Sequence, residues 1–322
     1  MKTRIFTEEN YTEKMNGEAA LWRDAHMKQL RFRSPGGTRL HSRYAVNPDA
    51  RGAVVLEHGF TEYAEKFLEM MYYFYQEGYS VFMYDQRGHG RSGRKIADEN
   101  LVYVASFDEY TSDLEYFIDH VVKKQAPGLP LLLFGHSMGG CVSALFVEQH
   151  PDVFRGAVLS SPMLKMAFGD TPELAVRFVA AFSNMAGWNA RGIPGTAGFK
   201  AEPDFEHSCA TSKARYLYHF DEQVTHRAYQ TTGATYGWAR AALRATDLVM
   251  KDAAKAAVPI LLCQAGQDQL VDNAAQDRFA MTAPDVTLVR FPTAKHEIYR
   301  STEDVLQLYY ETILNFFDSK IR

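Results

Sequence analysis

The chain has 322 residues, of which 46% are hydrophobic, so it is long enough to bury the core of one large α/β domain that carries an insertion. Its 35 lysines and arginines against 39 aspartates and glutamates give a net charge of −4, and no long block of like charges is present. This balance excludes the basic surface of a nucleic-acid-binding protein, so nucleic acid is not an expected partner.

The cysteines and the N-terminal sequence indicate the compartment. Cys141, Cys209 and Cys263 are odd in number and include no C-x-x-C pair, which is typical of free thiols in a reducing environment. The first residues lack the apolar stretch of a secretory signal, and no segment reaches the roughly 18 continuous apolar residues of a membrane-spanning helix. We therefore expect a cytoplasmic protein.

Predicted strands and helices alternate through the first half of the chain. A hairpin is predicted at its start, where the runs 29–33 and 39–46 flank the turn sequence S-P-G-G-T. Short apolar runs then predict strands at 53–58, 80–85, 129–135 and 157–161. Longer amphipathic runs between them predict helices at 66–77, 107–124 and 139–150. Strands separated by helices of this length form right-handed crossovers, so we expect a mostly parallel sheet.

This alternation breaks over residues 162–258. Helix-like runs at 173–182 and 236–243 lie on either side of a linker rich in glycine and proline, 187–198. We interpret the whole stretch as a cap that is inserted over the sheet.

The last part of the chain returns to the sheet. Apolar runs predict strands at 259–265 and 286–291, and residues 305–317 predict a terminal helix. The core is therefore expected to consist of 1–161 and 259–322.

The sequence G-H-S-M-G at 135–139 fits the pattern G-x-S-x-G, with a predicted strand before it and a predicted helix after it. A serine on such a strained turn exposes its hydroxyl at the carboxyl edge of the sheet. This context favours Ser137 as a nucleophile over a serine in a structural turn.

A serine nucleophile needs a general base and an acid that orients the base, and in this kind of fold they follow in the order serine, acid, histidine. Of the eleven histidines, His296 is the only one after His226, and it follows the strand that ends at Phe291, so we predict it as the base. Asp268 and Asp272 are the candidates for the acid. We favour Asp268, which comes first after its strand, and assign Asp272 to the N-cap of the next helix.

Backbone N–H groups must stabilise the oxyanion, and the fold supplies one after the nucleophile and one after an early strand. We predict the N–H groups of Met138 and of Phe60, which lies in the loop H-G-F-T-E-Y. His58 is interpreted as a support for that turn. Glu62 and Tyr63 are predicted to contact substrate, with a solvated loop face as the alternative.

Other motifs point away from cofactors. The loop D-Q-R-G-H-G-R-S-G at 85–93 has three glycines but lacks G-K-[ST], so we interpret it as a turn that braces the active-site loops and not as a phosphate loop. The histidines and cysteines lack metal-ligand spacing. We therefore expect no cofactor: no metal, nucleotide or prosthetic group.

Several strings together resemble a known family. L-E-H-G-F-T-E-Y, Y-D-Q-R-G-H-G-R-S-G, G-H-S-M-G-G, S-S-P-M, A-G-Q-D-Q-L-V-D and K-H-E-I-Y are similar to motifs of α/β-hydrolases in the branch of monoacylglycerol lipases, lysophospholipases and serine aminopeptidases. The resemblance runs over about 29–318. The strings G-R-S-G-R-K-I-A-D, A-T-S-K-A-R-Y and G-A-T-Y-G-W most resemble bacterial lysophospholipases of the L-two type, which are associated with the inner membrane.

The resemblance implies an α/β-hydrolase fold with a mostly parallel, eight-stranded sheet, helices on both faces and a mainly helical cap. The residues that match the family's catalytic triad and its oxyanion hole are Ser137, Asp268, His296, Phe60 and Met138. In this family a glutamate can stand in the place of Asp268 while the aspartate that matches Asp272 is kept. Asp272 therefore remains a second candidate for the acid of the catalytic triad.

The implied activity is hydrolysis of a carboxylic ester with a lipid-like acyl chain, a lysophospholipid or a monoacylglycerol, through an acyl-serine intermediate. Met163 and Phe178 belong to the Met- and Phe-rich part of the cap that is predicted to line an acyl channel, although such residues also suit packing of the cap onto the sheet. Peripheral contact of the cap with the inner membrane is left open, as are the head group and the oligomeric state.

Two other functions are weighed against this one. An aminopeptidase-like amide hydrolase or a short-chain carboxylesterase would use the same triad. The aminopeptidase needs an acidic anchor for the substrate ammonium, and the candidates are Glu62, Glu202, Asp204 and Glu206. A non-catalytic ligand-binding homologue would be marked by a broken triad, whereas this triad is complete.

Overall fold

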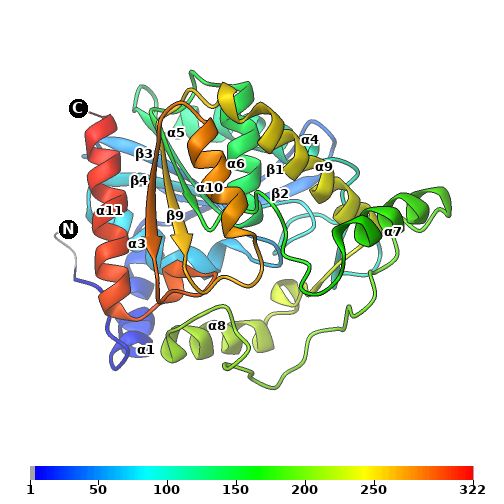
Figure 1. Cartoon of the computed structure of the whole chain (residues 1–322). Coiled ribbons are helices and arrows are strands. Elements are labelled where there is room, and N and C mark those ends of the chain that lie inside the picture. The colour runs from blue at the N-terminus through cyan, green and yellow to red at the C-terminus, as the bar shows by residue number, and fades with distance from the viewer. Residues whose placement is uncertain (1–3, 322) are drawn as a thin grey trace.

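An eight-stranded sheet forms the centre of the molecule (Figure 1). The computed structural model describes residues 4–321. The strands of the sheet, in chain order, are β1 (Lys28–Arg33), β2 (Arg39–Ala45), β3 (Gly52–Glu57), β4 (Tyr79–Asp85), β6 (Leu131–His136), β7 (Gly156–Ser160), β9 (Ile260–Ala265) and β10 (Val286–Phe291). Their order in space is β1-β2-β4-β3-β6-β7-β9-β10, and within this sheet β2 alone runs against the others. The predicted hairpin and the mostly parallel sheet are confirmed.

Helices cover both faces of the sheet. The helices of the core are α3 (Leu68–Gln76), α4 (Asp108–Phe117), α5 (Lys123–Gln125), α6 (Met138–Gln149), α10 (Asn273–Thr282) and α11 (Glu303–Lys320). One hydrophobic cluster joins α4, α6 and α10 to one face of the sheet, and a second cluster joins α3 and α11 to the other face. This layering is the one expected from alternating strands and helices.

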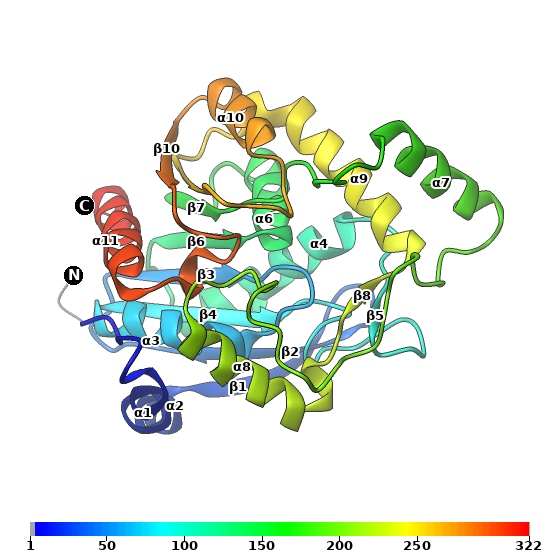
Figure 2. The same ribbon diagram turned by 60° about the horizontal axis from the view of Figure 1, so that its bottom comes forward.

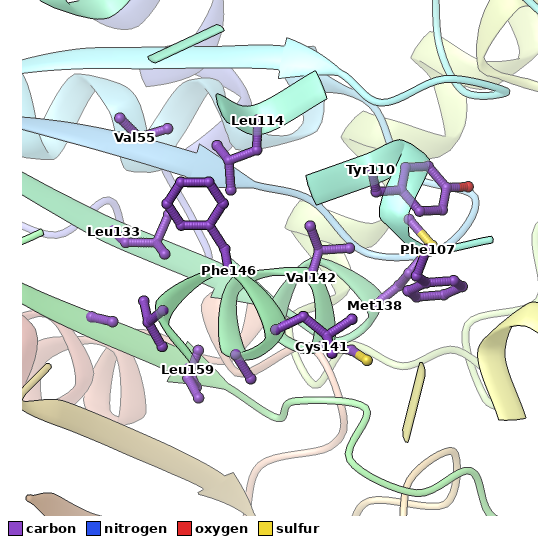
Figure 3. Close-up of a cluster of buried hydrophobic side chains, with 14 of the residues drawn as sticks. Val55, Phe107, Tyr110, Leu114, Leu133, Met138, Cys141, Val142, Phe146 and Leu159 are labelled. Atoms are coloured by element: carbon purple, nitrogen blue, oxygen red, sulfur yellow. The ribbon is translucent and has the colours of Figure 1, made fainter. Parts of the chain in front are cut away.

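The inner strands β3, β4, β6, β7 and β9 are buried on both faces, which explains why they read as mostly apolar runs in the sequence, whereas the edge strands β1 and β10 are partly exposed. In β3, Val55 belongs to the cluster on the α6 side, whereas the next residue, Leu56, belongs to the cluster on the α3 side. Figure 3 shows Val142 and Phe146 of α6 gathered with Val55 and with Leu114 of α4. The sheet and α6 thus form a dense support beneath the turn that carries Ser137.

The insertion contains three α-helices and one short strand, besides two short 3-10 turns. The α-helices and the strand are α7 (Glu173–Met185), α8 (Lys213–Thr225), β8 (Gly233–Ala234) and α9 (Tyr236–Asp252). β8 pairs in parallel with β5 (Leu101–Val102), which lies in the loop after β4. α9 packs on α6 and shares its hydrophobic cluster, so the end of the insertion belongs to the helical layer of the core. Figure 2 shows α7 standing outside these layers, on the far side of α9.

A helical segment precedes the hairpin and was not predicted. It consists of α1 (Tyr11–Lys14), a π-type turn at Met15–Ala19 and α2 (Ala20–His26). Tyr11, Met15, Ala19 and Trp22 are buried from this segment and pack with α3. Within residues 4–321, no helix combines the length and the apolar character that are needed to cross a bilayer.

Candidate active site

Ser137 occupies a sharp turn between β6 and α6. Its backbone has φ 52° and ψ −115°, a strained conformation for a residue with a side chain. The turn also requires glycine at position 139, because a Cβ atom there would lie 2.3 Å from the carbonyl oxygen of Glu57. The backbone therefore holds the Ser137 hydroxyl above the carboxyl edge of the sheet, and α6 begins directly behind it.

His296 and Asp268 come to Ser137 from two loops that follow β10 and β9. The Nε2 atom of His296 lies 2.8 Å from the Ser137 Oγ atom, and its Nδ1 atom lies 2.7 Å from Oδ2 of Asp268. The other carboxylate oxygen of Asp268 accepts the N–H groups of Leu270 and Val271, at 2.9 and 3.2 Å. With Nδ1–H donating to Asp268, Nε2 is left as the acceptor for the serine proton.

The two candidate acids take different positions. Asp268 faces His296, whereas the side chain of Asp272 accepts the N–H of Ala274 at 2.8 Å and caps α10. The N-cap assignment of Asp272 is confirmed. Between these two aspartates, the geometry therefore pairs Asp268 with the histidine.

The two predicted oxyanion donors belong to the start of α6 and to the loop after β3. Met138 is the first residue of α6, where a helix has no internal acceptor for the N–H group. The loop after β3 also reaches Ser137, because a Cβ atom on Gly59 would lie 3.1 Å from the Ser137 Cβ atom. Phe60 follows Gly59, and its ring packs on Trp238 of α9 with the ring centres 4.1 Å apart. Met138 thus follows the serine directly, and the loop that carries Phe60 reaches the serine at Gly59, while the oxyanion roles of the two N–H groups stay predictions.

Glu62 does not take the substrate-contacting position that the sequence suggested. Its side chain is buried, and its Oε2 atom accepts the N–H of Gly59 at 2.6 Å. Its Oε1 atom accepts from the Nζ atom of Lys66 at 2.8 Å and from the hydroxyl of Tyr299 at 2.5 Å. Burial opposes ionisation of this carboxyl, but the charge of Lys66 and the hydrogen bonds that Lys66 and Tyr299 donate hold the pKa of Glu62 below its ordinary value. Glu62 is therefore an ionised support for the loop after β3.

Lys66 extends this support to the histidine loop, and sequence reasoning missed it. Its Nζ atom donates to Oε1 of Glu297 at 2.5 Å, and Arg300 donates to the other oxygen of Glu297 at 2.6 Å. Burial raises the pKa of Glu297, but the charges of Arg300 and Lys66 bring it below the ordinary value. The one available signal was the spacing of four residues between Glu62 and Lys66, which suits an ion pair on a helical turn.

The other three residues that were predicted to contact substrate, Tyr63, Met163 and Phe178, lie in different environments. Tyr63 is also not free to contact substrate, because it is buried and its ring stacks on that of Tyr229 at 3.9 Å. Met163 is buried beside the nucleophile, and its N–H donates to the carbonyl oxygen of Ser137 at 2.9 Å. Phe178 lies on α7 and is 73% exposed. Among these three residues, Met163 therefore makes a direct backbone contact with Ser137.

His58 and the loop after β4 support the turn, as predicted. The Nε2 atom of His58 accepts the N–H of Gln86 at 2.9 Å, while its Nδ1 atom donates to the carbonyl oxygen of Gly59 at 2.8 Å. Asp85 accepts the N–H of Ala64 at 2.7 Å. These contacts tie the loops after β3 and β4 together. Within residues 4–321, no group of three or more His, Cys, Asp or Glu side chains is arranged to hold a metal ion.

The chain is similar to one protein family and to several known proteins. The family described as "Serine aminopeptidase, S33" matches residues 48–303. Lysophospholipase L2 of Escherichia coli strain K12 is 32% identical over 227 residues, which cover 70% of this chain and 66% of that protein. A monoacylglycerol lipase of Mycolicibacterium smegmatis is 29% identical over 293 residues, which cover 86% of this chain and 92% of that protein. The chain thus covers just under two thirds of the lysophospholipase.

Solved structures share the fold. A soluble variant of the monoglyceride lipase of Saccharomyces cerevisiae, in complex with a substrate analogue, has a TM-score of 0.73 at 19% identity and covers 91% of this chain and 94% of its own. A thermostable carboxyl esterase of Bacillus coagulans has a TM-score of 0.76 at 20% identity and covers 92% of this chain and 99% of its own. At these identities the likeness concerns the fold.

Proposed function

The chain belongs to the serine aminopeptidase family of α/β-hydrolases, and from this premise we propose that it is a serine hydrolase that cleaves carboxylic esters of lipid-like substrates, lysophospholipids or monoacylglycerols. The observation that carries the proposal is the continuous hydrogen-bonded relay from Ser137 through His296 to Asp268, with distances of 2.8 and 2.7 Å. The names of the similar proteins support the choice of ester.

The reaction follows from the geometry of the relay. Ser137 attacks the ester carbonyl while Nε2 of His296 takes its proton, and Asp268 stabilises the imidazolium that forms. The negative oxygen of the tetrahedral intermediate is bound by the N–H groups of Phe60 and Met138. When the intermediate collapses, the leaving alkoxide takes the proton from His296 and the acyl group stays on Ser137. Water then attacks the acyl ester by the same steps, and the fatty acid is released.

An apolar substrate is supported by the surroundings of the serine. Met163 is buried next to Ser137, and the ring of Phe60, in the loop that reaches Ser137 at Gly59, lies against Trp238. We assign residues 162–258 to a cap over this site, with α9 as its fixed part because α9 packs on α6.

The aminopeptidase alternative is less well supported. It needs a carboxylate that is free to bind a substrate ammonium, whereas the carboxylate of Glu62 is already shared by Gly59, Lys66 and Tyr299. Asp204 is exposed and pairs with His207 at 2.9 Å. A non-catalytic binding role is opposed by the intact relay, which a binding protein would not need.

α7 supports a peripheral contact between the cap and a membrane. Leu174, Phe178, Phe182 and Met185 follow one another at helical spacing and are 82, 73, 50 and 84% exposed. A contiguous apolar surface of this kind is typical of an interaction site. We expect L174S/F178S protein to float less well with phospholipid vesicles than the unchanged protein. Protein with L21S/M281S, whose sites are exposed apolar residues elsewhere, is the control.

The deciding experiment compares fatty-acid release from a long-chain lysophosphatidylcholine and from the monoacylglycerol with the same acyl chain. Ser137→Ala should abolish release by roughly a thousandfold or more, because the residual rate then rests on binding and the oxyanion site alone. Ser319→Ala, at an exposed serine of α11, should change nothing. Cleavage of a short chromogenic ester alone would contradict the assignment of a lipid substrate. The absence of Ser137-dependent cleavage of any ester would contradict the proposed ester hydrolysis itself.

A further inference from the structure

A pocket of about 610 Å³ lies at the carboxyl edge of the sheet, on the side of β1 and β2. Its walls come from this hairpin, from the loop after β4 and from residues 227–228 of the cap. None of Ser137, Asp268 and His296 lines it. Arginines line it instead, and they are Arg31, Arg39, Arg91, Arg94 and Arg227, together with His41 and one carboxylate, Glu99.

The positive charge of this arginine pocket is mostly not neutralised. Glu99 pairs with Arg227, at 3.2 Å. Among residues 4–321, no carboxylate lies within ion-pair distance of Arg31, Arg39 or Arg91. This concentration of cations is unusual on a protein whose net charge is −4.

Arg94 forms the partly buried end of the pocket and has neutral partners. Its guanidinium donates to the carbonyl oxygens of Gly90 and Ser92, both at 3.0 Å, and to the hydroxyl of Thr231 at 2.9 Å. Burial lowers the pKa of Arg94, against the smaller opposing effect of Glu99. A poorly hydrated cation without a counter-ion gains free energy when an anion binds beside it.

The nearest buried carboxylate does not supply that counter-ion. Asp85 lies at the end of β4, and its two oxygens accept the N–H groups of Ala64 and Arg91 at 2.7 and 2.8 Å. The Nδ1 atom of His41 stands 3.6 Å from it. The charge of Asp85 is therefore held within the fold by these donors. The guanidinium of Arg91 remains for a ligand, whereas that of Arg94 already donates to neutral oxygens and contributes its positive charge to the pocket.

We propose that the arginine pocket binds a phosphate ester, through its phosphoryl group. Several planar guanidinium groups around one space suit an anion with three or four acceptor oxygens, because each can donate in pairs. The volume suits a phosphorylated small molecule or lipid head group better than a bare ion. Binding here takes place apart from Ser137, so the inference does not depend on the proposed hydrolysis.

The pocket also connects to the catalytic loops. The guanidinium of Arg91 lies over the ring of Tyr229, 5.6 Å from its centre, and Tyr229 stacks on Tyr63, three residues after Phe60. Arg94 joins the loop after β4 to Thr231 of the cap. An anion in the pocket therefore contacts the segment that fixes the cap to the loop after β3.

The test measures binding of glycerol 3-phosphate by calorimetry at constant ionic strength, with glycerol plus sodium chloride as the blank. We expect saturable binding that R39Q/R91Q weakens at least tenfold. R155Q/R278Q is the control, because both sites are exposed and line no part of the pocket, and it should leave the affinity unchanged. Absence of saturable binding to both glycerol 3-phosphate and anionic vesicles would overturn the proposal, as would equal binding of both probes by R39Q/R91Q and the unchanged protein.

A second arm separates the two sources of the phosphate ester. Vesicles of phosphatidylcholine, with and without phosphatidylglycerol, are offered to the same proteins. A membrane head group is the ligand if R39Q/R91Q loses only the binding that phosphatidylglycerol adds, and a soluble phosphate ester is the ligand if only the calorimetric binding falls. If R39Q/R91Q fails to fold, hydrogen exchange of the amides of residues 90–99 is measured instead in the unchanged protein. Glycerol 3-phosphate or phosphatidylglycerol vesicles should slow this exchange. Exchange that neither probe slows would contradict the proposal.

Discussion

Lys66 joins the two loops that flank the nucleophile, since it binds Glu62 on one side and Glu297 on the other. In Lys66→Met protein these two buried carboxylates would lose the cation between them, Arg300 would remain for Glu297 alone, and the anchor of the Gly59 N–H would shift. We expect a loss of about 3 kcal/mol in the free energy of unfolding and a fall in kcat of roughly tenfold to a hundredfold. Urea unfolding and steady-state kinetics measure the two effects.

The matched control for this change is Lys165→Met, because the ion pair of Lys165 with Glu173 is exposed and worth little. Lys66→Arg should recover part of kcat, since it restores the charge. A folded Lys66→Met protein with the unchanged kcat would show that the network holds the fold but does not position the loops.

His136 makes the stability of the protein sensitive to acid. It is buried beside His296 with ring centres 4.9 Å apart, and burial lowers the pKa of His136 to about 4. The unfolded chain takes up a proton near the ordinary value of about 6.5, whereas the folded protein takes it up near 4. Between these values the unfolded state binds more protons, so the contribution of His136 to stability is present above pH 6.5 and is lost as the pH falls.

Replacement by a neutral side chain removes this effect. His136→Gln should reduce the slope of unfolding free energy against pH, between about pH 6.5 and pH 4, by up to about 1.4 kcal/mol per unit. Urea unfolding of both proteins at several pH values in this window checks the slope. Parallel curves for the two proteins would contradict the neutral, buried state of His136.

The sequence predicted the relay better than its surroundings. Ser137 is predicted from its sequence motif, and His296 is predicted from the order of the catalytic residues along the chain. Both signals can be read directly from the sequence. Glu62 and Tyr63 were misjudged because Thr61, with φ 64°, turns the chain between them and Phe60. Spacing alone does not tell which way side chains point after such a turn.

At the scale of elements, Asp268 and Asp272 differ in the partners of their carboxylates. Asp268 pairs with His296, whereas Asp272 caps α10. Asp268→Asn should lower kcat by roughly 10⁴-fold, because the wrong tautomer of His296 is then favoured. Asp272→Ala should cost about 1 kcal/mol of stability, since it removes the N-cap of α10, while kcat stays within about twofold. Kinetics and thermal unfolding of both variants decide between them. A large loss of kcat in Asp272→Ala alone would reverse the assignment.

The inner strands, which are buried on both sides, were predicted well from their composition, and the hairpin was predicted from its turn sequence. Mostly apolar runs mark the inner strands, and α6 follows its glycine-rich turn. The helical segment before the hairpin was missed because its buried residues are few and lie among polar ones. α8 was missed for a similar reason, since its buried side chains are the polar Arg215 and His219. The pairing of β5 with β8 has two residues on each side and leaves no periodic pattern.

At the scale of the whole molecule, the N-terminal segment fastens α8 to the core. Glu8 accepts the hydroxyl of Ser212 at 2.5 Å and the N–H of Ala214 at 2.7 Å, at the start of α8. Arg215 donates to the carbonyl oxygen of Phe6 at 2.8 Å and to Glu69 of α3 at 2.7 Å. These contacts fix α8, in the middle of the cap sequence, to the N-terminal segment and to α3 of the core.

Removal of residues 1–26 should therefore loosen α8 as well as expose α3. We expect the Tm to fall by roughly 5 °C or more and the amides of α8 to exchange faster, while those of α10, on the opposite face, change little. Hydrogen exchange followed by mass spectrometry reports on both helices in one experiment. Equal exchange of α8 in the shortened and full chains would mean that the Arg215 pair with Glu69 suffices.

The chain between α7 and α8 has one further consequence. Residues 186–212 form neither helix nor strand apart from a single bridge at Gly192, and they carry exposed trypsin sites at Arg191 and Lys200. Trypsin should cut here first, leaving Ser137 on one fragment and His296 on the other. Both fragments contribute strands to the same sheet, so the nicked protein should travel as one particle on gel filtration and separate only in detergent. Its remaining ester hydrolysis would then come from a relay assembled across two polypeptides.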